Sequence, residues 1–386
     1  MNRKQIGIIV LISAILVGSV FYFTSKKKPV VKQIQINGLP EQPTGPLNEG
    51  NVSPITGIAC ENWNKRPIAI MQPADVQARP AAGFSDADMV IEMPAFTNSV
   101  TRLMGVYGCT IPKETGAIRS ARHDYIPIAS GLNAVFVHWG YSKFAEGELD
   151  KKVINNINCL TTSFCERWTP TGKMRMEDTG FISSDKIVEA MTKYGYSTEN
   201  KFSGYAHQAE TPLESRPSGG RLRVSFPNPY DVDYDYDKAS NSYLRSWDGV
   251  EDFDKNNKKR VAPKNVVVMI AKSEQIKLDS NFPARGVQDP WDLVPKEEQQ
   301  GLDYGGVGRY NNMELGDPWF DTIDSGDATF YMNGQEVKGS WKKDKSKIDS
   351  KLAFFDQAGK EIQFVPGQIW VDIVEPGNVV RWTPAS

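Results

Sequence analysis

The residues of this chain best suited to chemistry lie between positions 111 and 142, in the segment IPKETGAIRSARHDYIPIASGLNAVFVHWGYS. Arg119 and Arg122 lie about one helical turn apart, just before a segment that we expect to form a helix capped by Ser120 or Asp124. Two guanidinium groups at this spacing offer a fork of donors that suits a carboxylate or a phosphate. The pattern predicts an anion-binding site at Arg119, Ser120 and Arg122.

A carboxylate and a third arginine lie on neighbouring segments. Glu92 is inside the apolar stretch Asp88–Pro94, and Arg102 begins the next one. An unpaired buried charge costs on the order of several kcal/mol, so Glu92 needs a partner. Either Glu92 pairs with one of the three arginines and fixes the packing of the strands, or at least one arginine binds an anionic ligand. Arginines outnumber carboxylates here, which favours a binding role and adds Arg102 to the predicted site.

His138 closes an apolar run, Ala134–Trp139, that predicts a buried strand. Site residues often follow such strands in α/β sheets, so Glu92 and His138 are candidate acid/base groups. Ser120 and Ser142 are candidate nucleophiles beside His138, but no nucleophile-elbow pattern surrounds either one. The alternative is a buried histidine with its hydrogen bonds satisfied, and His123 is expected to be exposed.

Local patterns predict the elements that position these residues. Strands are expected at Arg66–Gln72, Asp88–Pro94, Arg102–Tyr107 and Ala134–Trp139, and later at Leu222–Phe226, Val266–Ala271, Ala328–Met332 and Ile369–Val374. Helices are expected over Phe144–Lys151 and from Ser184 to Tyr194, with Ile187, Val188 and Met191 on one face. The dipeptide Asn333-Gly334 predicts a type I′ hairpin.

These elements predict an α/β or α+β N-terminal domain over residues 54–208 and a mainly-β C-terminal domain over residues 221–386. Residues 209–220 contain two prolines and a Gly-Gly pair, so they are the expected linker. The stretch Gly286–Asn312 is polar and unpatterned, which indicates a long surface excursion.

The N-terminal segment predicts one transmembrane helix at residues 5–24, followed by a flexible tether at 25–53. Ile6–Phe23 contains eighteen consecutive uncharged, mostly apolar residues flanked by basic ones, just enough to cross a bilayer. A cleaved signal peptide is the alternative. A lipid anchor would need a cysteine directly after the apolar region, and the first is Cys60.

The chain has four cysteines, an even number behind an export-type segment, which favours disulfides over four reduced thiols. Cys159 and Cys165 enclose a short loop and are the easiest pair to close, and Cys60 with Cys109 would then follow.

Composition and motifs exclude several other classes of function. The net charge of −2 gives no global attraction to nucleic acid. Asp231–Asp237 resembles a calcium loop but has Tyr236 at the glycine position and Ser242 where the bidentate glutamate belongs. It is expected to be an edge strand or turn with one acidic face. No phosphate-binding loop, dinucleotide fingerprint or zinc motif occurs, so we expect neither a cofactor nor a metal.

The order RPIAIMQ, ADMVIEM, VTRLMGVYG, ETGAIRSAR and AVFVHWG, followed by FYMNGQEVKGSW and GKEIQFVPGQIWVDIV, resembles the YerB-like lipoprotein family, which carries domain of unknown function 3048. The resemblance covers residues 54–386 and implies a bacterial surface-anchored protein with no assigned chemistry. Three features depart from the family pattern. The lipid-bearing cysteine is absent, Gly116-Ala117 replaces Gly-Pro, and Arg175-Met176-Glu177-Asp178 stands where the family tends to carry a histidine.

The preferred interpretation is a non-enzymatic, membrane-anchored extracytoplasmic protein. Its arginines would bind an anionic small molecule or a cell-envelope component, and its C-terminal domain would dock a partner protein. The alternative is an envelope hydrolase or transferase acting on a phosphate-linked or glycan substrate. That alternative requires Glu92, His138 and the arginines to converge on one open cleft.

Overall fold

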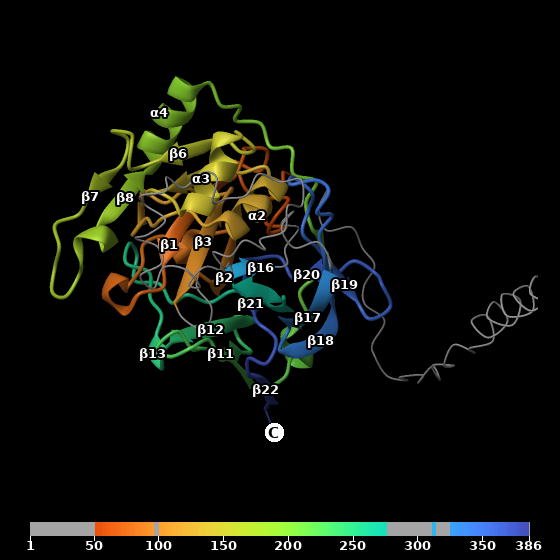
Figure 1. Cartoon of the computed structure of the whole chain (residues 1–386). Helices are drawn as coiled ribbons and strands as arrows, with labels where there is room; N and C mark the ends of the chain where they lie inside the picture. The colour runs from red at the N-terminus through yellow and green to blue at the C-terminus, as the bar shows by residue number, and fades with distance from the viewer. Residues whose placement is uncertain (1–50, 96–99, 276–310, 314–324, 386) are drawn as a thin grey trace, which may run out of the picture. The chain divides into compact units, whose positions relative to one another are not determined.

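The four strands predicted before the linker, and three of the four predicted after it, lie in one mixed sheet (Figure 1). The computed structural model describes residues 51–95, 100–275, 311–313 and 325–385, which form mainly strands with few helices. The large sheet has ten strands, in the order β19 (Ala353–Asp356), β18 (Gln335–Lys342), β17 (Ser325–Met332), β14 (Asn265–Ile270), β21 (Ile369–Val374), β2 (Met89–Pro94), β3 (Thr101–Tyr107), β1 (Ile68–Pro73), β5 (Val135–His138) and β6 (Asn156–Asn158).

The two halves of the chain meet inside this sheet. Strand β2 of the first half pairs in parallel with β21 of the second, with Met89 opposite Ile369 and Glu92 opposite Asp372. On its other side β21 pairs in parallel with β14, and β2 pairs antiparallel with β3. A strand between two others has its backbone groups paired on both edges, so the junction is held by continuous backbone hydrogen bonding.

Alternate residues of the central strands enter two different cores. In β1, Ala69 and Met71 lie in one hydrophobic cluster, whereas Ile68 and Ile70 lie in the other. All six residues of β1, β2 and β21 are buried, so both faces of these strands are covered. Strands covered on both faces show nearly continuous apolar runs, which is why they were recognisable in the sequence.

Different layers cover the two faces. Helices α2 (Ile126–Gly131) and α3 (Lys143–Asp150) supply Ile126 and Leu149 to the first cluster. The second cluster contains Tyr234, and also Ile187 of α4 (Ser184–Tyr194). Tyr234 belongs to a five-stranded sheet in the order β13 (Val250–Glu251), β12 (Ser242–Trp247), β11 (Val232–Asp237), β10 (Gly220–Val224) and β22 (Val380–Pro384).

Short elements complete the described fold. The small sheets pair β15 (Ser273–Gln275) with β16 (Asn311–Met313), β20 (Gln363–Phe364) with β9 (Ala206–His207), and β8 (Gly180–Ser183) with both β4 (Glu114–Gly116) and β7 (Glu166–Arg167). The 3-10 turns are η1 (Val76–Ala78), η2 (Phe84–Asp86), η3 (His123–Tyr125), η4 (Met176–Asp178) and η5 (Leu213–Ser215).

Most local predictions agree with the structure. Ser142 and Ser183 cap α3 and α4 through their side chains, and Gly195 ends α4 in the left-handed conformation. Asn333 and Gly334 both have positive φ and join β17 to β18 as the hairpin signal predicted. Such turns favour Asn-Gly because both central residues must adopt positive φ.

Four local predictions were wrong. The helix expected from Ser120 does not begin there, because residues up to Arg122 are extended and α2 starts at Ile126 without a side-chain cap. Val188 is exposed rather than on the buried face of α4. The acidic segment forms β11, an interior strand of its sheet rather than an edge strand, and His123 is buried.

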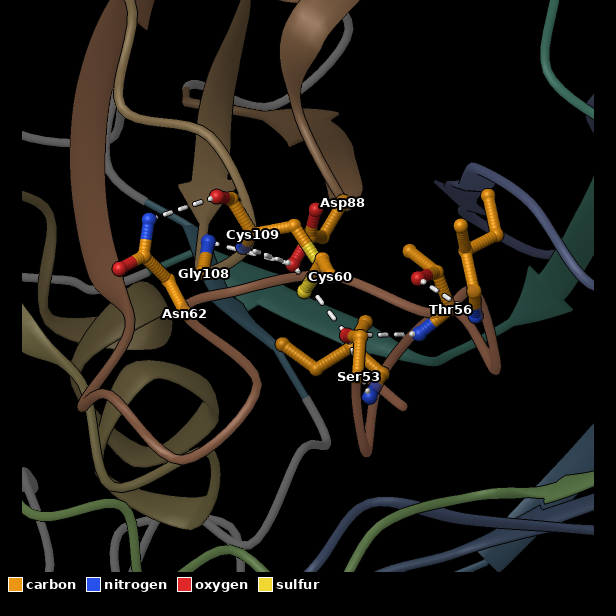
Figure 2. The surroundings of a disulfide bond; sticks show 9 residues. Ser53, Thr56, Cys60, Asn62, Asp88, Gly108 and Cys109 are labelled. Carbon is orange, nitrogen blue, oxygen red and sulfur yellow. Dashed lines mark hydrogen bonds between the residues drawn. A yellow bond between two sulfur atoms is a disulfide. The ribbon is translucent and has the colours of Figure 1, made fainter. Parts of the chain in front are cut away.

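Both expected disulfides are formed. Cys159 bonds Cys165, and Cys60 bonds Cys109 across 49 residues of sequence. Figure 2 shows the second bond tying the loop that opens the folded body to the end of β3.

Several predictions fall on other parts of the chain. The transmembrane helix at residues 5–24 and almost all of the tether at 25–53 lie outside the described residues, as does most of Gly286–Asn312. Within the ranges that the structure describes, no helix combines the length and apolar character needed to span a membrane.

The shared sheet predicts that the first half will not fold alone. A fragment of residues 54–208 lacks β21 and would expose the long, apolar edge of β2. We expect it to be insoluble or to lack dispersed amide signals in a two-dimensional NMR spectrum, whereas residues 51–386 give a dispersed spectrum. A soluble fragment with native-like dispersion would show that the halves are independent.

Candidate functional site

The segment carrying Arg119 and Arg122 is extended and lies at the carboxyl ends of two parallel strands. The amide of Arg119 donates to the carbonyl of Met71 in β1 at 2.9 Å, and the amide of Trp139, after β5, donates to the carbonyl of Arg119 at 3.0 Å. The amide of Ala121 continues this pairing onto Gly140 at 3.0 Å. Ligand sites in α/β sheets commonly occupy this end of the strands.

Three arginines share two aspartates here. Arg102 contacts Asp75 at 3.4 Å, and Arg119 contacts Asp178 at 3.3 Å. Arg175 bridges the two carboxylates, with Nη2 at 3.1 Å from Asp75 and Nε at 2.8 Å from Asp178. The cluster therefore joins β3, the loops after β1 and β4, and the turn η4. Arg175 also contacts the carboxylate of Glu177, which is 52% exposed, at 3.4 Å.

Arg102 is the most deeply buried member of the cluster, at 3% exposure. Burial, together with the positive charges of Arg122 and Arg119, lowers its pKa to about 9. These three arginines therefore lie near enough to repel one another. The Nε atoms of Arg102 and Arg119 are buried, and neither has a hydrogen-bond partner among the described residues. Buried donors normally have a partner, although the Nε of the fully buried Arg245 lacks one as well. This cluster differs because Arg119 and Arg175 are 17% and 40% exposed, which gives it the character of a binding site.

The remaining predicted residues lie at the same place. Arg122 donates to the carbonyls of Ala121 and Ser120, at 3.1 and 3.5 Å. Tyr230, from the second half of the chain, is half-buried beside the cluster. Burial raises its pKa, and the charge of Asp75 acts in the same direction, opposed by Arg102, Arg79 and Arg175. Both halves of the chain therefore contribute to the surroundings of the arginines.

Glu92 does not belong to this cluster. Its Oε2 accepts from Nη2 of Arg245 at 2.7 Å, and its Oε1 accepts from the hydroxyl of Thr101 at 2.6 Å. The other amino group of Arg245 donates to Asp252 at 2.5 Å. Both Glu92 and Arg245 are 0% exposed. The expected Glu–Arg pair exists, but its arginine comes from the second half rather than from positions 102, 119 or 122.

A second buried carboxylate lies directly opposite Glu92. Asp372 of β21 accepts from the hydroxyl of Tyr234 at 3.0 Å and from the indole of Trp370 at 3.2 Å. Burial, reinforced by the charge of Glu92, raises the pKa of Asp372 to about 8. Burial lowers the pKa of Arg245, but Glu92, Tyr234 and Asp252 outweigh that effect and raise it overall. At neutral pH Asp372 therefore carries the proton while Arg245 and Glu92 form the ion pair.

His138 is a buried histidine with both ring nitrogens bonded. Nδ1 lies 2.8 Å from the carbonyl of Gly140, and Nε2 lies 3.2 Å from the amide oxygen of Asn156. Burial lowers its pKa, and its side chain is 0% exposed. Strands β3 and β1 separate it from the strand that carries Glu92. The open cleft shared by Glu92 and His138, which the enzyme interpretation required, is not formed.

Two nearby glutamates of the first half have their polar partners elsewhere. Glu114 accepts from the indole of Trp168 at 3.0 Å, and Glu92 binds Arg245. Ser142 caps a helix rather than approaching His138 as a nucleophile.

The acidic residues of β11 are paired with basic ones. Asp233 lies 3.2 Å from both Arg221 and Arg223. No group of three residues suited to metal binding occurs in the described part of the chain.

Sequence reasoning missed Asp75, Asp178 and Arg175 as members of the cluster. The signal for Asp75 was its place just after β1, at the edge where parallel strands present site residues. For Arg175 and Asp178 the signal was their spacing of three residues, which suits an ion pair in a single turn. Arg245 offered no local signal, because its partner Glu92 is 153 residues away.

These features define a two-domain, mainly-β protein whose domains share a sheet. The chain belongs to the family described as "Protein of unknown function (DUF3048)": the N-terminal domain matches residues 55–197, and the C-terminal domain matches residues 222–290 and 305–371. This confirms the family resemblance seen in the sequence.

A curated relative and a solved structure extend this result. The protein described as "Putative lipoprotein YerB" from Bacillus subtilis (strain 168) is 25% identical over 326 residues, which cover 83% of this chain and 86% of the relative. The crystal structure of the YerB protein from Bacillus subtilis aligns with a TM-score of 0.67 at 24% identity. That alignment covers 86% of this chain and 99% of the solved chain, so the two share a fold.

The buried carboxyl group of Asp372 predicts a measurable pH dependence of stability. Its pKa is about 8 in the folded state against an ordinary 3.8, so its contribution to stability falls as pH rises through about 8. In Asp372→Asn this part of the dependence of the unfolding free energy on pH should disappear. The slope of unfolding free energy against pH then changes by at most about 1.4 kcal/mol per pH unit. Urea unfolding at intervals from pH 5 to 9 measures it.

The exposed carboxylate at the end of α3 provides the control, because Asp150→Asn should keep the slope of the parent protein. An unchanged slope in Asp372→Asn would contradict the protonated state inferred for Asp372.

Proposed function

We propose that this is a membrane-anchored, extracytoplasmic protein that binds an anionic ligand through Arg102, Arg119, Arg122 and Arg175. The observation that carries the proposal is the sharing of two aspartates by three arginines, with buried Nε donors on Arg102 and Arg119. The Nε of the sealed Arg245 is unpaired too, but the donors of this cluster lie beside arginines that solvent can reach. The ligand supplies the acceptors, as a phosphate or carboxylate does for a guanidinium fork.

The geometry of the ion pairs supports this role. Arg119 and Arg102 contact their aspartates through Nη1, at 3.3 and 3.4 Å, so these are not the short bidentate pairs that bind most strongly. Arg175 is 40% exposed and Arg119 is 17% exposed, which leaves an approach from solvent. A ligand would therefore meet Arg175 first and bind Arg119 behind it.

Membrane anchoring rests on the sequence before the folded body. The apolar segment Ile6–Phe23 is long enough for one membrane-spanning helix. The Bacillus relative is named as a lipoprotein, which supports attachment at the outer side of the cell membrane. In this chain all four cysteines are paired in disulfides, so the helix, rather than a lipid on a cysteine, is the proposed anchor.

Substitution of single arginines tests the binding site. Arg119→Gln, Arg122→Gln and Arg175→Gln should each weaken binding of pyrophosphate or citrate, because each removes charge-assisted hydrogen bonds worth about 1–3 kcal/mol. Isothermal titration calorimetry of the full-length protein at low ionic strength measures the loss, and the melting temperature should change little.

Arg221→Gln is the matched control, since Arg221 is an exposed arginine paired with an aspartate outside the cluster. It should bind both anions like the parent protein. If the parent protein binds neither anion, or if the three substitutions unfold the domain while the remaining folded fraction binds normally, the arginines have only a structural role.

Topology is tested separately. Protease added to wall-stripped cells should digest residues 51–386 and leave a membrane-protected fragment that contains Ile6–Phe23. Immunoblots against epitopes placed at each end of the protein follow both products. Full protection of the folded body would place it on the cytoplasmic side and end the extracytoplasmic proposal.

A further inference from the structure

A cavity that shares no lining residue with the arginine cluster lies where the first residues of the folded body meet the segment after α4. Its volume is about 670 Å³, and its walls come from residues 52–54, 63–65 and 198–207. This volume falls within the roughly 300–1,000 Å³ of typical small-molecule sites. Nothing in the anion-binding proposal uses this cavity.

Backbone hydrogen bonds hold the two walls together. The amide of Asn200 donates to the carbonyl of Asn64 at 3.0 Å, and the amide of Tyr205 donates to Pro54 at 2.8 Å. Lys65 and Glu199 are partners in an isolated antiparallel bridge. Because backbone atoms make these contacts, the side chains along the walls are not needed to close the cavity.

The first wall is braced on the large sheet, as Figure 2 shows. The disulfide Cys60–Cys109 and the hydrogen bond from the Asn62 amide to the carbonyl of Cys109, at 3.1 Å, fix the loop that carries Trp63. Ser53 lines the cavity, and its hydroxyl donates to the buried carboxyl of Asp88 at 3.4 Å. The wall is therefore a prearranged surface, which reduces the entropy lost when a ligand binds.

The lining combines aromatic rings with neutral polar groups. Trp63 is 38% exposed at the rim, and Phe202 and Tyr205 are nearly buried, with ring centroids 5.2 Å apart. Asn64 and Ser203 add an amide and a hydroxyl, each of which can donate and accept hydrogen bonds.

The formal charges of the lining cancel. Lys65 and Glu199 carry opposite charges. Burial lowers the pKa of His207, so that ring is neutral at pH 7, and one of its nitrogens already lies 3.1 Å from the carbonyl of Ile55. The cavity therefore does not select an anion, in contrast with the arginine cluster.

We infer that this cavity binds a short, uncharged oligosaccharide. A pyranose ring has an apolar face of C–H groups and a rim of hydroxyls that donate and accept. An exposed indole suits the apolar face of the sugar, and side-chain amides and hydroxyls suit its rim of hydroxyl groups. A peptide would present unpaired backbone amides in a fixed direction, whereas the wall backbones on this cavity are already bonded to each other.

Calorimetric titration with the tetramer of N-acetylglucosamine and with maltotetraose tests the inference. The full-length protein is kept in a zwitterionic, sugar-free detergent, so that the detergent does not compete. At least one oligosaccharide should bind. Trp63→Ala and Asn64→Ala should each weaken that binding about tenfold, which is about 1.4 kcal/mol, whereas Trp63→Phe retains a ring and should lose less.

Two controls separate this site from other effects. Phe253→Ala removes a similarly exposed aromatic side chain, 39% exposed, outside the cavity, and should bind like the parent protein. Arg119→Gln should not change sugar binding, and Trp63→Ala should not change pyrophosphate binding, so the two proposals can fail independently.

Three outcomes would overturn the inference. The first is that protein with an unchanged melting temperature binds neither oligosaccharide. The second is that oligosaccharide binding survives both Trp63→Ala and Asn64→Ala. The third is that a proline-rich peptide binds in a Trp63-dependent manner and displaces neither sugar.

Discussion

A fully buried guanidinium group, that of Arg245, lies between Glu92 of the first half of the chain and Asp252 of the second. Two indole rings enclose it, with its central carbon 4.3 Å from the ring centroid of Trp370 and 4.5 Å from that of Trp247. Breaking such a pair by removing one partner leaves an unpaired buried charge, which costs about 3–5 kcal/mol. The parallel pairing of β2 with β21 places the protonated Asp372 opposite Glu92, so the charge of Glu92 is balanced by Arg245. The union of the halves therefore depends on Arg245.

The arginine cluster follows from the same architecture. Joining the halves brings Tyr230 beside Arg102, while the ends of β1, β3 and β5 bring together Asp75, Arg102 and Arg119. The two arginine-rich regions differ in one respect. Around Arg245 each nearby carboxylate has a hydrogen-bond donor and the group is sealed, whereas Arg119 and Arg175 remain partly exposed. A sealed network holds the fold, and an open cluster can exchange one partner for a ligand.

The sequence predicted what depends on neighbours along the chain. Apolar runs located β1, β2, β3, β5 and β21 within one or two residues, and the helix expected from Ser184 to Tyr194 has the bounds of α4. The six-residue spacing of Cys159 and Cys165 was enough for their disulfide. Arg119 and Arg122 were expected just before a helix capped by Ser120 or Asp124. No helix begins at Ser120, because Arg119 pairs with Met71 and Trp139, and α2 begins only at Ile126.

What the sequence did not predict depends on long-range pairing. The parallel contact of β2 with β21 joins residues 280 positions apart and leaves no trace in either local pattern. Because the sequence does not reveal this strand pairing, it gave no reason to pair Glu92 with Arg245. The arginines nearer in the sequence were therefore the expected partners. Arg175 likewise has an aspartate three residues away, but only the fold brings its second partner, Asp75, into contact.

The central claim is that the open arginine cluster holds an anion, and diffraction at the selenium edge tests it most directly. Crystals of the folded body, with ordinary methionine and soaked in selenate, would locate the anion by its anomalous signal. The account predicts a peak within hydrogen-bond distance of the guanidinium groups of Arg119 and Arg175. Selenate found only elsewhere, with Arg119 and Arg175 still bound to Asp178 and Asp75 alone, would contradict it.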